Sequence, residues 1–143
     1  GAGVLDLFVG GVGTGGSITG IGRRVKKANA TARVVSVIPD IFPGIEGLKP
    51  LGHAKDIVPE ILDETIIDER VDARIEDAID VIQLLAKKGV FVGPSSGAYV
   101  SAALKVAETR KYKTIVTLLN DTGERYTSTG VWRAQESSVR AGE

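Results

Sequence analysis

The sequence predicts an α/β fold, in which a parallel sheet carries helices on both of its faces. Short apolar, β-branched runs alternate along the 143 residues with segments whose apolar side chains recur at helical spacing. Two of these runs end in loops of glycine and small hydroxyl residues that lead into a helical segment. Strands that feed helices in this way build βαβ units, whose strands lie parallel and are covered on both sides.

Composition narrows the class of protein. The apolar fraction of 43% and the charged fraction of 25% are typical of a soluble globular domain, and the length suits a single one. The formal net charge is zero, which argues against a nucleic-acid binder or a membrane-surface binder, since either needs a positive field. Without cysteine, and with His53 as the single histidine, the chain has no disulfide, no thiolate and no residues for a histidine-rich metal site.

The sequence carries no targeting signal that we can identify. It has no apolar run long enough to cross a bilayer and no basic segment leading into a signal-type stretch, so we expect a cytoplasmic protein. It contains no methionine and starts with glycine a few residues before a strand-like run. We therefore expect the chain to be a fragment of a longer protein.

The first part of the chain predicts a strand, a helix and a second strand. Residues 4–9 form a short apolar run that ends in glycines, and residues 33–38 (RVVSVI) form a β-branched run. Between them, residues 17–30 place apolar side chains at helical spacing and basic side chains outward. The glycine- and proline-rich residues 42–59 that follow predict an irregular connection.

The second part continues the alternation. Residues 65–71 predict a short strand, and Asp72 can cap a helix that runs to about Lys88 and stops at Gly89. Residues 90–92 predict a third core strand.

A helix of small residues, running to about Arg110, is predicted after that strand. Residues 114–119 then predict a strand, and residues 120–129 a polar turn region. The tail beyond Arg133 is polar and is predicted to be loose.

The loop VGGVGTGGSITG, residues 9–20, is the first candidate binding site. Successive backbone N–H groups from Gly13 to Ser17 can converge on a phosphate, and the following helix presents its positive end to the same anion. The hydroxyls of Thr14 and Ser17 add neutral donors. No Gly-Lys-Ser/Thr ending is present, so the loop does not match a nucleotide-triphosphate P-loop.

Three interpretations of this loop remain open on its own residues. The spacing Gly11-x-Gly13-x-x-Gly16 also satisfies the dinucleotide fingerprint, and Asp40 lies near the end of the next strand, where a ribose partner is expected. A nicotinamide or flavin domain is therefore an alternative to a smaller phosphate ligand. The third interpretation is a tight turn with close helix–strand packing and no ligand.

A second loop, GPSSGA at residues 93–98, repeats the arrangement of small hydroxyl residues before a helix. In a parallel sheet both loops lie at the carboxyl ends of strands, where ligands bind. Ser96 is expected to be the N-cap of the helix, whereas Ser95 is available to a ligand. Two such loops facing one crevice suit a compact ligand with a phosphate at one end and a ring nitrogen at the other, and pyridoxal phosphate has that shape.

Three motifs, GVGTGGSITG, GPSSGA and DTGERYTSTGVW, resemble in order and spacing the C-terminal half of the cysteine synthase family of fold-type II pyridoxal phosphate enzymes. PGIEGL and the GERYTSTGVW ending are most similar to the B-type members, which accept sulfur donors other than sulfide. The resemblance covers residues 4–133. It implies that residues 1–133 are the C-terminal part of a cofactor domain of the tryptophan synthase β-like fold, incomplete here, and that residues 134–143 are a polar tail.

The resemblance also implies roles for individual residues. Ser95 would bond the pyridine nitrogen, and a neutral serine hydroxyl can donate to an unprotonated nitrogen. The implied reaction is β-replacement on O-acetylserine, in which a sulfur donor gives L-cysteine, in a homodimer. The cofactor phosphate would be held by Gly13, Thr14, Gly15, Gly16 and Ser17.

The family's Schiff-base lysine lies upstream of these motifs, and no matching motif occurs in this chain. We therefore expect no catalytic residue here, and a chain that is inactive alone. A cystathionine β-synthase or another fold-type II lyase is the alternative within the resemblance. His53 is expected to be a loop residue and Trp132 a packing or subunit-contact residue, while Asp121, Glu124 and Arg125 are expected to form a structural ion pair.

Overall fold

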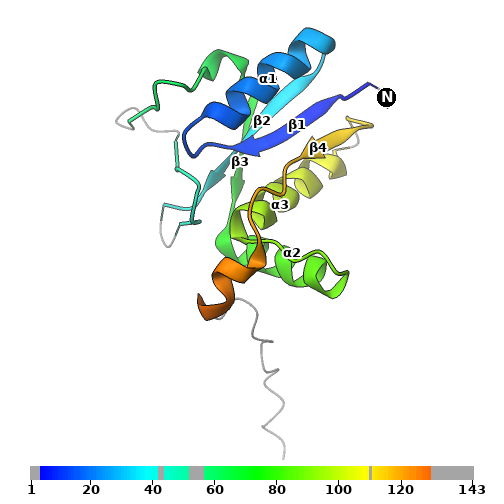
Figure 1. Cartoon of the computed structure of the whole chain (residues 1–143). Coiled ribbons are helices and arrows are strands. Elements are labelled where there is room, and N and C mark those ends of the chain that lie inside the picture. Colours follow the sequence, from blue (N-terminus) through cyan, green and yellow to red (C-terminus); the bar gives the residue numbers. More distant parts are fainter. Residues whose placement is uncertain (1–3, 42–43, 52–56, 110, 130–143) are drawn as a thin grey trace, which may run out of the picture.

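A four-stranded parallel sheet forms the centre of the protein (Figure 1), in the order β3-β2-β1-β4. The computed structural model describes residues 4–41, 44–51, 57–109 and 111–129. Helix α1 covers one face of the sheet, and helices α2 and α3 cover the other. The predicted fold class is therefore confirmed. The elements are β1 Leu7–Gly11, α1 Gly16–Ala28, β2 Arg33–Pro39, β3 Glu69–Ala73, α2 Ile75–Lys87, α3 Pro94–Glu108 and β4 Ile115–Thr117, with short 3-10 helices η1 Glu64–Ile66 and η2 Gly123–Thr129.

Strand β1 pairs in parallel with both β2 and β4, so that Leu7 lies opposite Arg33 on one side and Ile115 on the other. Strand β3 extends the sheet beyond β2 in the same direction. Because all strands are parallel, the loops that follow β1 and β4 leave the sheet at the same end, where the carboxyl ends of the strands lie. Ligands bind at this end in open α/β sheets.

The two central strands are buried on both faces, which explains their nearly continuous apolar sequences. Alternate side chains of each strand enter two separate clusters. The cluster beneath α2 and α3 contains Leu7, Val9, Val35, Val37, Ala78, Ala98, Tyr99 and Ala102. The cluster beneath α1 and η1 contains Phe8, Val12, Ile18, Val34, Leu62 and Ile66.

Helices α2 and α3 approach each other at Gly97. A Cβ built on Gly97 would overlap the carbonyl oxygen of Ala78 and the Ile82 side chain, both from α2. A glycine is therefore required at this crossing by space alone.

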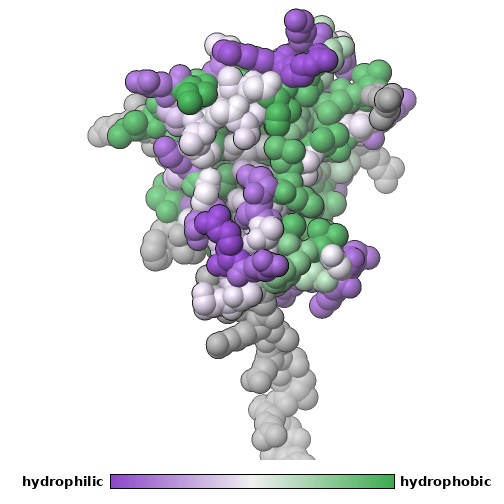
Figure 2. Space-filling model, viewed as in Figure 1, coloured by the Kyte–Doolittle hydropathy of each residue, from purple (hydrophilic) through white to green (hydrophobic). Residues whose placement is uncertain are grey.

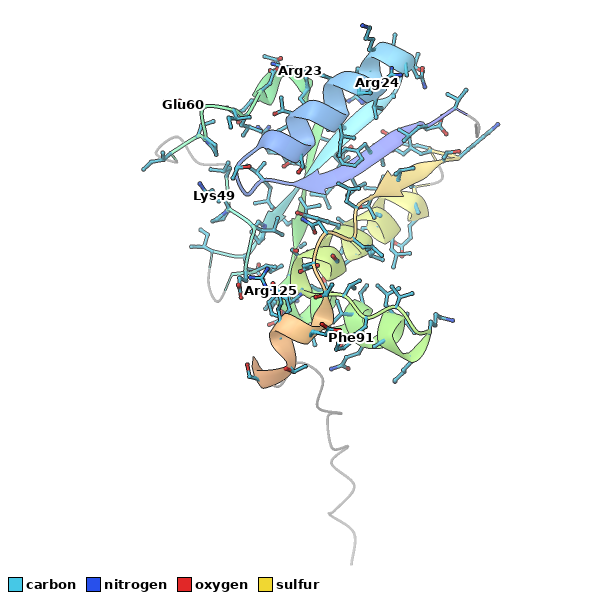
Figure 3. All side chains as sticks on the ribbon, in the orientation of Figure 1. Arg23, Arg24, Lys49, Glu60, Phe91 and Arg125 are labelled. Carbon is cyan, nitrogen blue, oxygen red and sulfur yellow. The ribbon has the colours of Figure 1, made fainter. Side chains whose placement is uncertain are left out.

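The prediction of a third core strand at residues 90–92 is wrong. The only pairing there is an isolated antiparallel bridge between Val92 and Thr122, and Val90 and Phe91 are 37% and 42% exposed. Figure 3 labels Phe91 in the segment between α2 and α3. The place beside β1 is taken by β4, so this apolar run does not join the sheet.

Two boundaries also differ from the prediction. The strand predicted at residues 65–71 starts later, because the side chain of Asp63 accepts the Thr65 N–H at 3.1 Å and holds a 3-10 turn first. Asp72 lies within β3 and does not cap α2. Instead, the Asp40 carboxylate, from the end of β2, accepts the N–H of Ile75 at 3.2 Å.

Several predictions concern residues outside the described ranges. His53, Trp132 and the tail at residues 134–143 belong to this group. In the irregular connection, the described residues 44–51 and 57–59 contain neither helix nor strand, as predicted.

Strand β4 forms one edge of the sheet, and its outer side has no partner among the described residues. Val116, Leu118 and Leu119 are between 38% and 47% exposed, and Leu104 of α3 is 53% exposed. Figure 2 shows hydrophobic side chains gathered on the side of the molecule where β4 and α3 lie.

Two glycine-to-alanine changes in helices should have opposite effects. Gly97→Ala should lower the free energy of unfolding by about 1–3 kcal/mol, because the methyl group meets Ala78 and Ile82. Gly20→Ala should raise it by about 0.5–1 kcal/mol, since an added Cβ has open space within α1 and alanine lowers the entropy lost on folding. Urea unfolding of both variants measures the difference; equal effects would contradict the tight crossing of α2 and α3.

Candidate active site

The glycine loop reverses the chain from β1 into α1 over residues 12–15. Gly15 is the N-cap of α1 and has φ +90°, in the left-handed region that favours glycine. A Cβ at Gly15 would lie 2.7 Å from the Leu62 Cβ. The protein itself therefore requires glycine at this position, whatever the loop binds.

The first turn of α1 has unpaired backbone donors. No side chain caps it and no acidic residue lies in it. The Gly16 N–H has only a long contact of 3.4 Å with the Thr14 hydroxyl, and the Ser17 and Ile18 amides have no acceptor among the residues that the structure describes. Unpaired N–H groups and the helix dipole together make such a turn a site for an anion.

Gly16 differs from its neighbours in what surrounds it. A Cβ at Gly16 would find only ordinary contacts, at 3.6 Å from the Thr14 hydroxyl and 4.0 Å from Ile61. At Gly13 the carbonyl oxygen of Gly47 would lie 3.0 Å away. Glycine at position 16 therefore leaves space that no described residue fills.

Residues 44–51 pack across the carboxyl end of β1. The Lys49 N–H donates to the Val12 carbonyl at 2.7 Å, and Figure 3 labels Lys49 in this segment. A Cβ on Gly11 would overlap Leu48 and come within 2.6 Å of the Tyr99 ring. The connection thus closes over one side of the glycine loop.

The second predicted loop forms the buried first turn of α3. Gly93 is the N-cap and Pro94 follows at the start of the helix, a position that proline favours. The prediction of Ser96 as N-cap is wrong, because the helix begins earlier and places both serines inside its first turn. Both side chains are instead held by Asp121 from the segment after β4.

Asp121 accepts three hydrogen bonds from this turn. Its Oδ2 accepts from the Ser95 hydroxyl at 2.8 Å, and its Oδ1 accepts from the Ser96 hydroxyl and, at 3.3 Å, from the Ser96 N–H. A carboxylate at a helix N-terminus also interacts favourably with the dipole. The start of α3 therefore has its own anion, whereas the start of α1 has none among the described residues.

The expected ion pair of Asp121, Glu124 and Arg125 is not formed: among the described residues these side chains make no ion pair with one another. The Asp121 carboxylate packs closely on the N-cap of α3 instead, since a Cβ on Gly93 would overlap it and the Tyr126 ring.

Tyr99 connects the two loops. It lies one turn after Ser95 in α3, packs on Gly11 at the end of β1, and hydrogen-bonds Asn120, whose Oδ1 is 3.4 Å from the Ser95 Oγ. Burial raises the pKa of the Tyr99 phenol, and the Asp121 charge raises it further, against hydrogen bonds with Asn120 and Gly11. Tyr99 is not among the site residues predicted from the sequence, although its spacing of four from Ser95 places both on one helix face.

Two further findings apply to the described part of the chain. No group of three or more His, Cys, Asp or Glu side chains there is placed to hold a metal ion. No helix there is both long and apolar enough to span a bilayer.

The family model of pyridoxal-phosphate-dependent enzymes matches residues 1–121. Cysteine synthase B of Campylobacter jejuni is 42% identical over 133 residues, which are 90% of this chain and 44% of that protein. Cysteine synthase of Aquifex aeolicus is 42% identical over 136 residues, 91% of this chain and 41% of that protein.

Solved structures give the same result. A hydrogen sulfide-producing enzyme from Fusobacterium nucleatum has a TM-score of 0.80 and 34% identity over 92% of this chain and 41% of its own. O-ureido-L-serine synthase has a TM-score of 0.78 and 36% identity over 97% of this chain and 45% of its own. The chain therefore spans less than half the length of these relatives. With this fold and these relatives, the chain belongs to the family of pyridoxal-phosphate-dependent enzymes.

Proposed function

We propose that this chain carries the phosphate-binding and ring-nitrogen part of the cofactor site of a cysteine synthase. The whole protein would transfer a sulfur nucleophile onto the β-carbon of O-acetylserine and release acetate. The observation that carries the proposal is the open first turn of α1. This turn lies at the same end of the sheet as the turn that carries Ser95, which is bonded to Asp121 after β4. The names of the relatives support cysteine as the product.

The described residues fit pyridoxal phosphate by their donor chemistry. The phosphate would be held by backbone amides and hydroxyls of Gly13, Thr14, Gly15, Gly16 and Ser17, without a lysine in the loop. The space beside Gly16 admits an oxygen close to the backbone. Ser95 would meet the ring nitrogen, held in place by Asp121.

The bound cofactor would supply an electron sink for the charge that develops at the carbon next to the amino group. This chain's residues would bind the cofactor and fix its orientation at both ends. The buried Tyr99, between the two loops, would exclude water from their junction. The lysine that would hold the cofactor covalently is proposed to lie in a segment outside these 143 residues.

The exposed outer side of the edge strand β4 supports the proposal that this chain is part of a larger domain. Exposed sheet edges invite pairing, and natural proteins cover or charge them. The apolar side chains along β4 make its outer side suited to packing against further polypeptide. We propose that residues 1–133 complete their cofactor domain with the rest of a longer protein, which acts in the cytoplasm as a homodimer.

One of the observations that favoured a dinucleotide-binding domain no longer supports it. Asp40, the residue expected to bind a ribose, uses its carboxylate to hold the first N–H of α2. A cystathionine β-synthase or another fold-type II lyase would use the same cofactor loops, so this alternative differs only in its substrates.

Gly16→Ala should weaken retention of pyridoxal phosphate at least ~10-fold, which corresponds to about 1.4 kcal/mol, because the methyl group fills the space proposed for a phosphate oxygen. The thermal midpoint of the cofactor-free protein should not fall, since the added Cβ has only ordinary contacts. Cofactor absorbance after dialysis of the full-length protein measures the retention.

Gly20→Ala, one turn further along α1, is the matched control and should retain the cofactor like the wild type. Gly15→Ala should lower the midpoint of the cofactor-free protein, because of the positive φ and the contact with Leu62. If Gly16→Ala keeps the wild-type affinity, the loop serves packing and does not hold the phosphate.

The full-length protein should convert O-acetylserine and a sulfur nucleophile into cysteine. Steady-state assays with sulfide, thiosulfate and homocysteine, each against O-acetylserine, identify the donor. Turnover with homocysteine alone would move the assignment to a cystathionine β-synthase. Inactivity toward every acylserine would remove the synthase proposal and leave the cofactor proposal in place.

A further inference from the structure

The open first turn of α1 lacks the interactions that hold most helix starts in place. Its N-cap is Gly15, which has no side chain to accept an amide hydrogen, and Gly16 follows it. Glycine loses more backbone freedom on folding than any other residue, and a capping side chain would have added a stabilising hydrogen bond. Amides that bind an anion tightly must nevertheless be fixed in direction before the anion arrives. This turn therefore needs support from outside the helix.

Residues 62–66, which include η1, supply this support along one side of α1. Gly15, Thr19 and Arg23 are four residues apart, so they lie one above the other on that side, and all three lie against the segment. The Leu62 backbone packs directly on the turn, since a Cβ on Gly15 would lie 3.0 Å from the Leu62 Cα. Figure 3 labels Arg23 where α1 meets this segment.

Asp63 joins the segment to α1 through both its backbone and its side chain. The Asp63 N–H donates to the Thr19 hydroxyl at 3.0 Å, and Thr19 is only 4% exposed. The Asp63 Oδ2 accepts from two guanidinium nitrogens of Arg23, at 2.8 and 3.1 Å. The Asp63 Oδ1 accepts from the N–H and the hydroxyl of Thr65 and so stabilises η1. One residue thus ties η1 to α1 at two points.

The Arg23 guanidinium is not placed as a countercharge for an anion at the open turn. Its Cα lies seven residues beyond Gly16, which is about 10 Å along the helix axis. Both of its nitrogens that bond Asp63 meet the same carboxylate oxygen, so its charge is already paired. Any effect of Arg23 on the open turn therefore passes through the segment that Asp63 belongs to.

Building on the proposed function, we propose that Asp63 is a positioning residue: through Thr19 and Arg23 it holds residues 62–66 against α1, and so fixes the first amides of α1 in the direction that binds the phosphate of pyridoxal phosphate. None of these residues belongs to the loop at residues 13–17 that is proposed to hold the phosphate. Their contribution is to remove freedom that the turn would otherwise lose on binding. The turn can leave its amides open because Asp63, and not a capping side chain, holds it in place.

A second tie on α1 separates positioning from general stability. The Lys26 Nζ bonds the Asp68 Oδ2 at 2.6 Å, and the same oxygen accepts the Val34 N–H at 2.7 Å. This tie joins the last turn of α1 to the residue before β3, and Lys26 lies ten residues, about 15 Å along the axis, beyond Gly16. Lys26→Gln is therefore the matched control, because it loosens the same helix at its other end.

The test changes the two partners of Asp63, since replacing Asp63 itself would also remove its bonds to Thr65. The affinities of the cofactor-free, full-length protein for pyridoxal phosphate and for pyridoxal are measured separately, beside its thermal midpoint. Thr19→Val leaves the Asp63 N–H without its acceptor and should weaken pyridoxal phosphate about fivefold. Pyridoxal, which has no phosphate, should bind Thr19→Val as it binds the wild type.

Two further variants complete the comparison. Thr19→Ser keeps the hydroxyl and should restore the wild-type affinity for pyridoxal phosphate. Lys26→Gln should lower the thermal midpoint and keep that affinity. Arg23→Gln breaks an ion pair in which the arginine side chain is 64% exposed, so it should cost little stability. It should nevertheless weaken pyridoxal phosphate and leave pyridoxal unchanged, and it serves as the test if Thr19→Val fails to fold.

Three results would overturn the inference. The first is wild-type affinity for pyridoxal phosphate in Arg23→Gln or in a folded Thr19→Val. The second is an equal loss of pyridoxal phosphate and pyridoxal in either variant, and the third is a loss of pyridoxal phosphate in Lys26→Gln as large as in Thr19→Val. Each of them leaves the proposed function standing as long as the wild type binds pyridoxal phosphate more tightly than pyridoxal. A wild type without that preference removes the proposed phosphate site as well.

Discussion

The site depends on one backbone constraint, the reversal of the chain between β1 and α1 at a glycine of positive φ. Gly15 makes this turn possible, and the Leu62 backbone and Cβ beside it leave no room for a side chain. The reversal places the first amides of α1 near the carboxyl ends of the strands. Because β4 lies beside β1 and runs parallel to it, the segment that follows β4 and carries Asp121 lies at the same end of the sheet. The positions of the two candidate loops thus follow from the order of the strands and from one turn.

The two helix starts at this end of the sheet differ in how their positive ends are satisfied. Helix α3 receives the Asp121 carboxylate, which accepts both serine hydroxyls, whereas α1 receives no carboxylate among the described residues. An external anion therefore has a place at α1 and would meet an existing charge at α3. This asymmetry gives the candidate site a direction: an open helix start at one end and a hydroxyl at the other, with Tyr99 between them.

Local sequence patterns predicted the first βαβ unit well, because β1 and β2 are buried on both faces and α1 has one apolar side. They failed at residues 90–92, where an equally apolar run lies outside the four-stranded sheet. They also failed at Ser96, because its partner lies 25 residues further along the chain and no local rule connects the two. Gly15 and Gly16 look equivalent in sequence, and the structure distinguishes them: Gly15 has a positive φ and packs against Leu62, whereas Gly16 has open space beside it.

The proposed function requires that the open turn of α1 holds the phosphate of pyridoxal phosphate. Equilibrium dialysis of the full-length protein against pyridoxal phosphate, pyridoxal and NAD, each at the same concentration, tests this claim most directly. We expect pyridoxal phosphate to be retained, pyridoxal to be held far more weakly because it lacks the phosphate, and NAD not to be retained. Retention of NAD, or of pyridoxal as tightly as its phosphate ester, would contradict the proposed function.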